Sequence, residues 1–171
     1  MRNVPLLRFD LTECPLPEES IDAVLLLNVL EHIAEDSVAI EQVHRILKPG
    51  GLAVIEVPAG PHLFDVYDRF LLHYRRYSIT GLCNMVESVG FKVIRRSHLG
   101  CFVYPGFRLI KKRNKRFLSE ANFIQEKIVA QNILKAKQSR FLSALMDIEL
   151  ILGKWFSYPF GIRCLLTCMK E

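Results

Sequence analysis

The sequence contains no Cys-x-x-Cys pair, no low-complexity segment and no internal repeat. Its five cysteines form an odd set, which is not typical of a disulfide framework or a zinc site. We therefore expect buried thiols in a reducing compartment. The cysteines are Cys14, Cys83, Cys101, Cys164 and Cys168.

Long apolar runs are also missing. The two most apolar windows, 99–110 and 141–152, are interrupted by proline or charged residues, and neither reaches the roughly 20 residues that a membrane span requires. The first residues are too few and too charged for a signal peptide. The sequence thus predicts a cytoplasmic protein that is soluble or, at most, peripheral to a membrane.

The 171 residues that are present, half of them hydrophobic, suffice for one domain with a core. The net charge of +5 favours anionic partners but does not choose among nucleic acid, lipid headgroups and metabolites. Near Gly100 the pattern changes from alternating strands and helices to a basic, mostly helical stretch. We expect a single domain over 1–171, with a helical insertion over 105–153.

Short apolar runs alternate with amphipathic segments, which predicts an α/β fold. We expect strands at 4–9, 21–27, 52–57, 91–94 and 162–169. Helices are expected from a cap at Asp36 or Ser37 to the Lys48-Pro49-Gly50-Gly51 stop, from the Ser78 cap to Gly90, and over 118–137 and 140–153. Strand, helix, turn and strand in this order indicate a right-handed parallel crossover.

Several motifs together resemble class I S-adenosylmethionine-dependent methyltransferases. The similarity to their third to fifth strands is carried by Arg8-Phe9-Asp10-Leu11, Pro15-Leu16-Pro17, Ser20-Ile21-Asp22-Ala23-Val24, Asn28-Val29-Leu30-Glu31-His32-Ile33 and Leu47-Lys48-Pro49-Gly50-Gly51. His73-Tyr74-Arg75-Arg76-Tyr77-Ser78 resembles a stretch that one subgroup carries after its fifth strand, and 160–165 is similar to its closing strand. The resemblance implies an incomplete Rossmann-like fold with a mainly parallel sheet.

The resemblance also implies transfer of a methyl group from S-adenosyl-L-methionine to a small-molecule or lipid-linked acceptor. Nothing before Asp10 supplies the glycine-rich loop that holds the cofactor in this family. The family's strand order is third, second, first, fourth, fifth, seventh, sixth, so strand 21–27 becomes an open apolar edge. Either an N-terminal piece is missing, or a partner or a second copy covers the edge, or strand 4–9 has moved across to pair with it. The alternative function is an inactive, truncated module that acts as a binding partner.

Four residues are cofactor candidates by this resemblance: Asp10, Leu11, Asn28 and Val29. Asp10 would accept a hydrogen bond from the adenine amino group beside the Leu11 backbone. Asn28 and Val29 follow the strand at the point where strand order reverses. A solvated aspartate and a helix-capping asparagine are the structural alternatives.

His32 is the candidate general base, since neutral imidazole can take a proton from a substrate hydroxyl near neutral pH. A structural histidine is the alternative. Glu31 and His32 resemble the end of a Glu-x-x-Glu-His magnesium site found in some O-methyltransferases. Asn28 replaces the first glutamate of that motif, so we predict no metal.

The substrate-binding candidates lie in the stretch that the family places over the cofactor and substrate mouth: His73, Arg75, Arg76 and Tyr77. Either arginine can clamp an anionic group through two parallel hydrogen bonds. The alternative is that one arginine pairs with a core carboxylate, Glu31 or Asp68, and the other is solvated.

A basic run follows an aromatic stretch and consists of Lys111, Lys112, Arg113, Lys115 and Arg116. Such a pattern can rest on an anionic membrane surface, and a solvated charge run is the alternative. Nucleic-acid binding is not predicted, because stacking aromatics are not spaced among the charges.

Overall fold

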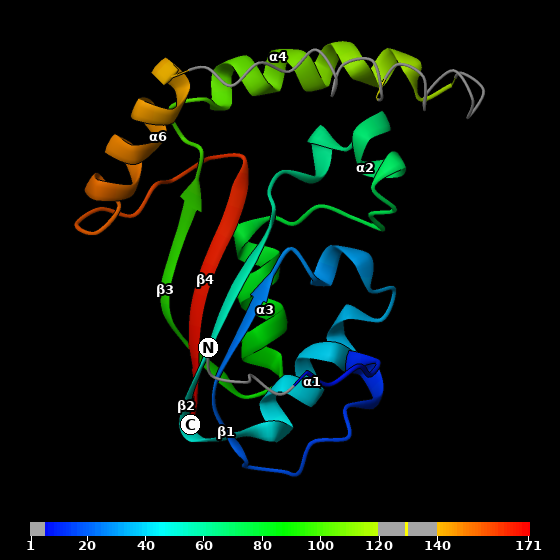
Figure 1. Cartoon of the computed structure of the whole chain (residues 1–171), viewed down its shortest axis with the longest axis vertical. Helices are drawn as coiled ribbons and strands as arrows, with labels where there is room; N and C mark the ends of the chain where they lie inside the picture. Colours follow the sequence, from blue (N-terminus) through cyan, green and yellow to red (C-terminus); the bar gives the residue numbers. More distant parts are fainter. Residues whose placement is uncertain (1–5, 120–128, 130–139) are drawn as a thin grey trace.

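The structure is a computed structural model that describes residues 6–119, 129 and 140–171. Its sheet has the strand order β1-β2-β4-β3 (Figure 1). The strands are β1 (Ile21–Leu27), β2 (Leu47–Pro58), β3 (Phe91–Leu99) and β4 (Arg163–Lys170). β1 and β2 are parallel, and β4 is antiparallel to both of its neighbours. Three strands therefore run in one direction, which confirms the mainly parallel α/β sheet.

Two helices, α1 (Asp36–Ile46) and α3 (Ile79–Ser88), pack on one face of the sheet. Beyond the carboxyl ends of β1 and β2 lie the short α2 (Val66–Phe70) and the longer α4 (Tyr104–Asn114), while α6 (Arg140–Leu152) lies beside the top of β3 (Figure 1). Single 3-10 turns are η1 (Leu11–Glu13), η2 (Leu30–His32), η3 (Pro61–Leu63) and η4 (Lys115–Phe117). Within the described residues, no helix is long and apolar enough to cross a membrane.

The two helix starts differ in how they are capped. Ser78 caps α3 as expected, because its hydroxyl accepts a hydrogen bond from the Gly81 backbone N–H at 3.1 Å. The predicted cap of α1 by Asp36 or Ser37 is wrong, since the N-cap position is Glu35 and makes no side-chain cap bond. Asp36 is instead buried and binds side chains of the 75–77 loop.

The core lies between the sheet and the two helices. Alternate residues of the central strands point into it, as period-two geometry requires. Ile55 of β2 and Leu166 of β4 are fully buried there against Ile40 of α1 and Leu82 of α3. Burial also raises the pKa of the core thiols Cys164 and Cys168 to about 12, as expected for buried cysteines.

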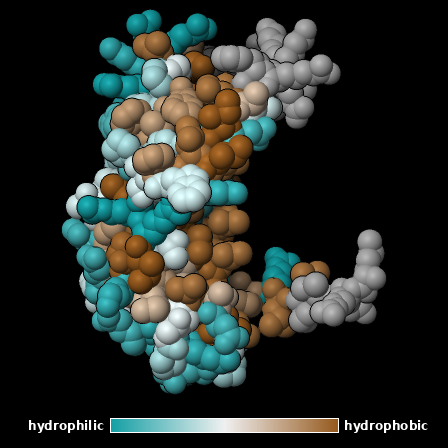
Figure 2. All heavy atoms as spheres, turned by 90° about the vertical axis from the view of Figure 1, so that its left-hand side faces the viewer, coloured by the Kyte–Doolittle hydropathy of each residue, from teal (hydrophilic) through white to brown (hydrophobic). Residues whose placement is uncertain are grey.

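The opposite face of the sheet is open. Leu25, Leu27 and Leu52 are 65%, 50% and 41% exposed, and all three alternate with core-facing neighbours. Hydrophobic side chains form a band along this side of the molecule (Figure 2). β1 is the first strand in the sheet order and pairs with β2 alone among the described strands. The open apolar edge is thus confirmed for the described part of the chain.

Other expectations need correction. Residues 6–9 form no strand, and residues 4 and 5 of that predicted strand lie outside the described residues. β3 continues to Leu99 rather than ending at residue 94, and α2 and α4 are additional elements. Most of the predicted helix 118–137 also falls outside the described residues, and the insertion over 105–153 stays a prediction.

Candidate functional site

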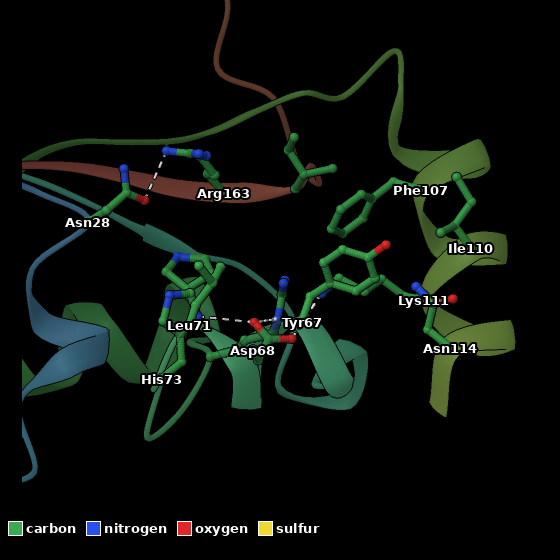
Figure 3. A pocket seen from close by; sticks show the side chains of 13 residues that line it. Asn28, Tyr67, Asp68, Leu71, His73, Phe107, Ile110, Lys111, Asn114 and Arg163 are labelled. Atoms are coloured by element: carbon green, nitrogen blue, oxygen red, sulfur yellow. Dashed lines mark hydrogen bonds and ion pairs between the residues drawn. The ribbon is translucent and has the colours of Figure 1, made fainter. Parts of the chain in front are cut away.

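A pocket of about 310 Å³ opens beyond the carboxyl ends of β1 and β2 (Figure 3). Asn28 and Pro58 at the ends of these strands line one side, and Phe107, Ile110 and Lys111 of α4 line the other. Its remaining lining residues are Tyr67, Asp68, Leu71, His73, Arg76, Asn114, Ile162 and Arg163. Open α/β sheets bind ligands at this end of their strands.

Asn28 joins β1 to the pocket through an unusual backbone. Its φ of 56° is left-handed, a conformation that asparagine tolerates better than most residues. Its backbone N–H donates to the Glu56 carbonyl at 2.9 Å, and its Oδ1 accepts from the Arg163 guanidinium at 2.9 Å (Figure 3). The helix-cap alternative is wrong, because Val29 is the N-cap of η2 and makes no side-chain cap bond.

A buried ion network forms the floor of the pocket. Lys111 Nζ lies 2.6 Å from Asp65 Oδ1 and 2.9 Å from Asp68 Oδ2. Arg76 Nε donates to Asp68 Oδ1 at 2.8 Å. Burial raises the pKa of Asp68, but the hydrogen bonds and charges of Arg76 and Lys111 outweigh burial and leave that pKa well below its ordinary value.

This network corrects one expectation about the basic run. Lys111 is buried with its ammonium between two carboxylates, so it cannot contact a membrane. The exposed members of the run are Lys112, Arg113, Lys115 and Arg116. Membrane contact through these four residues stays a prediction.

Phe107 of α4 lies beside the two buried cations of the pocket. The Arg76 guanidinium carbon lies 5.6 Å from the centre of its ring, and Lys111 Nζ lies 5.4 Å from it. Both distances are in the range of cation–π attraction. The ring therefore gives the pocket an apolar wall directly beside two buried cations.

The predicted substrate loop is tied to the core by its arginines. Arg75 donates to Asp36 Oδ1 at 2.9 Å and to the Ala34 carbonyl at 2.6 Å, and its side chain is 40% exposed. Arg76 pairs with Asp68 rather than with Glu31. Both arginines therefore have carboxylate partners. The structural alternative expected such a partner for only one arginine and a solvated position for the other. Binding of an anionic substrate group stays a prediction.

Tyr77 is a buried anchor of the same loop. Its hydroxyl lies 2.7 Å from Asp36 Oδ2 and 3.1 Å from the Leu30 carbonyl oxygen. Burial raises the pKa of this phenol well above its usual range, and the Asp36 carboxylate raises it further. The phenol is therefore a neutral structural donor and is not among the residues that line the pocket.

Next to the pocket, Glu31, His32 and His73 place their ligand atoms within 4.8 Å of one another. Glu31 is fully buried, and desolvation raises its pKa. His32 is exposed and meets the His73 ring edge-on at 4.7 Å between ring centres. His73 Nδ1 lies 3.1 Å from Asp68 Oδ1, and burial lowers the pKa of this imidazole.

Asp10 and Leu11 do not line the pocket. Asp10 is exposed, and its Oδ1 accepts bonds from the Thr12 backbone N–H at 2.9 Å and hydroxyl at 2.8 Å, which start η1. These bonds lower the pKa of the carboxyl group, so it is ionised. Leu11 packs against the core. The predicted site residues therefore fall into two groups, one at η1 and one at the pocket.

Comparison with known proteins gives three kinds of match. A family model described as a methyltransferase domain matches residues 1–55. A probable S-adenosylmethionine-dependent methyltransferase from Mycolicibacterium smegmatis is 29% identical over 66% of this chain and 44% of its own length. A demethylmenaquinone methyltransferase from Staphylococcus aureus is 27% identical over 75% of this chain and 51% of its own length.

A solved methyltransferase from Thermotoga maritima, described as a possible histamine N-methyltransferase, has a TM-score of 0.56 at 16% identity, over 99% of this chain and 66% of that one. The resemblance to class I S-adenosylmethionine-dependent methyltransferases is confirmed. The strand order of this methyltransferase-like chain is the family order of the fourth, fifth, seventh and sixth strands. The chain spans about half the length of the curated relatives it matches.

Three features of the methyltransferase-like chain were not predicted from its sequence: the burial of Asp65, the burial of Lys111 and the position of Phe107. One signal was available, because Asp65 and Asp68 have capping-box spacing. Asp65 accepts from the Tyr67 N–H at 3.0 Å, and Asp68 accepts from the Asp65 N–H at 3.0 Å. No local signal marks Lys111, since its partners lie more than forty positions earlier in the chain.

Proposed function

We propose that this chain is part of a methyltransferase that uses S-adenosyl-L-methionine and binds its methyl acceptor in the pocket beyond β1 and β2. The observation that carries the proposal is the position of that pocket, which begins at Asn28 where β1 ends. The cofactor supplies an electrophilic methyl group, and holding the acceptor in line with it does most of the catalytic work.

The cofactor residues fit this role. The ionised, exposed carboxylate of Asp10 is an acceptor suited to the adenine amino group, and the Leu11 backbone lies beside it. Asn28 and Val29 lie at the strand end, where the left-handed turn changes the direction of the backbone. Together these four residues would hold the two ends of an extended ligand.

The pocket suits an acceptor with an apolar body. Phe107 and Ile110 from α4 and Leu71 from the 70–73 segment form its apolar wall, and Arg76 adds a polar edge (Figure 3). A small-molecule or lipid-linked acceptor is compatible with this lining, and relatives named demethylmenaquinone methyltransferase are among the matches. His32 would take the proton from an acceptor hydroxyl, because its exposed imidazole lies against His73 of the pocket wall.

Calorimetric titration with S-adenosylhomocysteine tests the proposal. We expect Asp10→Ala to weaken binding about tenfold or more, because one hydrogen bond to a charged group is lost. Asp22→Ala is the matched control, since this aspartate is also exposed but pairs with Lys48. Equal affinities of the two variants, or no binding by the unmodified chain, would contradict the proposal.

The second candidate function, a binding module, is favoured by the open apolar edge. Leu25 and Leu27 leave apolar surface beside the edge of β1 that no described strand pairs with, and such edges pair with other chains. The partner would be a second copy of the chain. Light scattering after gel filtration should then show a dimer that Leu25→Lys dissociates. Leu109→Lys, at a 70% exposed position on α4, should leave it intact. A monomeric unmodified chain would rule out this candidate.

A further inference from the structure

Glu31 is a buried carboxylate next to the pocket. Its side chain is fully buried, and among the described residues no other residue gives either carboxylate oxygen a hydrogen-bond partner. Burying a carboxylate costs several kcal/mol unless it is paired or coordinates a metal. The neighbouring cations do not supply the pairing, since Arg76 and Lys111 bind Asp65 and Asp68.

The buried cations of this region are already paired with carboxylates other than Glu31. Three buried carboxylates, Glu31, Asp65 and Asp68, share this region with two buried cations, Arg76 and Lys111. The other nearby charges form separate pairs, Arg75 with Asp36 and Arg163 with Glu56. Glu31 is therefore the carboxylate of this region without a cationic partner among the described residues, and a bound metal cation would supply one.

Two imidazoles converge on Glu31. The ligand atoms of Glu31, His32 and His73 lie within 4.8 Å of one another. A tetrahedral zinc ion with bonds of about 2.1 Å needs ligand atoms about 3.4 Å apart, so small side-chain rotations suffice. Two imidazoles and one carboxylate are a donor set that zinc and other first-row divalent metals accept.

His73 is already oriented as a metal ligand would be. Its Nδ1 is bonded to Asp68 at 3.1 Å, which leaves Nε2 as the nitrogen for a metal (Figure 3). Metal-binding histidines usually have their second nitrogen bonded to a carboxylate in this way. Asp68 in turn is fixed by Arg76, by Lys111 and by the Asp65 backbone N–H.

The backbone also holds the two ligand segments together. The Tyr74 N–H donates to the Glu31 carbonyl at 2.8 Å, and the His73 N–H donates to the Asp68 carbonyl at 2.8 Å. The His32 N–H closes η2 on the Val29 carbonyl at 3.0 Å. These bonds place η2 against the 73–74 segment independently of any ligand.

From this geometry we infer that Glu31, His32 and His73 form a binding site for a divalent transition metal, with zinc as the best match. Asp68 positions His73 and does not bind the metal itself. Three protein ligands leave a fourth position open, and the exposed His32 places that position toward solvent. The site would therefore take a water molecule or an oxygen-containing ligand. Metal binding here does not depend on methyl transfer, and in the metal-bound form His32 is a ligand and does not act as the general base.

The test uses the chain after treatment with a chelator, titrated with Zn²⁺ by calorimetry and with Co²⁺ by visible absorption. We expect one metal per chain and Co²⁺ bands of tetrahedral intensity. His32→Asn, a change at an exposed position, should weaken Zn²⁺ binding about tenfold or more and diminish those bands. Glu31→Gln should do the same and should reduce the increase in melting temperature that Zn²⁺ produces in the unmodified chain.

His62→Asn is the matched control, because His62 is exposed on η3 and is not part of the cluster. It should bind Zn²⁺ as the unmodified chain does. Circular dichroism of each metal-free variant verifies that it is folded. The inference is overturned if the unmodified chain binds no Zn²⁺, or if His32→Asn and Glu31→Gln bind it as tightly as His62→Asn.

Discussion

Lys111 is a buried lysine, and lysine is seldom fully buried unless its charge is paired. Its ion pairs attach α4 to the rest of the fold. Its ammonium joins α4 to Asp65 and Asp68 at the start of α2, and its side chain is 6% exposed. A buried ion pair contributes little net stability by itself, but removing one partner leaves the other buried and unpaired. One oxygen of Asp65 already has no hydrogen-bond partner in the part of the chain that the structure describes, so the region has little tolerance for this loss.

We predict that Lys111→Met lowers the free energy of unfolding by about 3 to 5 kcal/mol, as measured by urea denaturation. The methionine fills a similar volume, so the loss reports the charge. Lys112→Met is the control at an exposed neighbouring position and should change stability by less than about 0.5 kcal/mol. Similar losses in the two variants would show that the buried network does not hold α4.

The buried thiols give a prediction for alkaline pH. The pKa of Cys168 is raised to about 12 from an ordinary value of 9.0. Stability from the neutral thiol is therefore complete below pH 9.0 and is lost as pH rises toward 12, because only the unfolded chain ionises there. Between about pH 8 and about pH 10, Cys168→Ala should lose about 1.4 kcal/mol less unfolding free energy than the unmodified chain. Parallel pH profiles would contradict this.

Among the elements, α6 is connected to the sheet through one carboxylate. Glu149 accepts hydrogen bonds from the backbone N–H groups of Gly100, Cys101 and Phe102 at 2.6, 3.0 and 3.1 Å. The three donors follow the end of β3, where Gly100 has a φ of 75°. The carboxylate thus satisfies a turn whose N–H groups would otherwise be unpaired.

We predict that Glu149→Ala destabilises the chain by roughly 3 kcal/mol, because backbone donors lose a charged acceptor. Hydrogen exchange at residues 100–102 should accelerate in this variant. Asp147→Ala, at an exposed position of the same helix, should leave both properties unchanged. Unaltered exchange in Glu149→Ala would mean that the turn is held by other contacts.

Elements with strong local signals were predicted well from the sequence. β1 has the expected bounds, α3 has its Ser78 cap, and the described part of α6 lies within the expected helix 140–153. Each depends on periodicity or capping within a few residues. The predicted cap of α1 failed because Asp36 has tertiary partners, Arg75 and Tyr77, that compete with local capping.

The candidate site was predicted only in part, because some of its residues are held by partners that are distant in sequence. Asn28, His73 and Arg76 come together at the pocket, as their motifs suggested. The role of α4 was missed, because Phe107 and Lys111 reach the site through contacts that are distant in sequence. Sequence patterns identify such residues as aromatic or basic but do not show what they pack against.

On the scale of the whole molecule, the two faces of the sheet differ sharply. One face is covered by α1 and α3, and the other leaves leucines of β1 and β2 exposed (Figures 1 and 2). The pocket, the metal candidates and Asn28 all lie beyond the carboxyl ends of β1 and β2. We propose that this end of the sheet, together with η1, binds the cofactor and the methyl acceptor.

Hydrogen–deuterium exchange with and without S-adenosylhomocysteine shows which segments the ligand contacts. We expect the ligand to slow exchange of two segments, residues 10–13 at η1 and residues 28–32 at the end of β1. Residues 142–152 of α6 should exchange at the same rate in both samples. Protection confined to α6 or to the open sheet face, or no protection at either predicted segment, would show that the ligand does not bind at this end of the sheet.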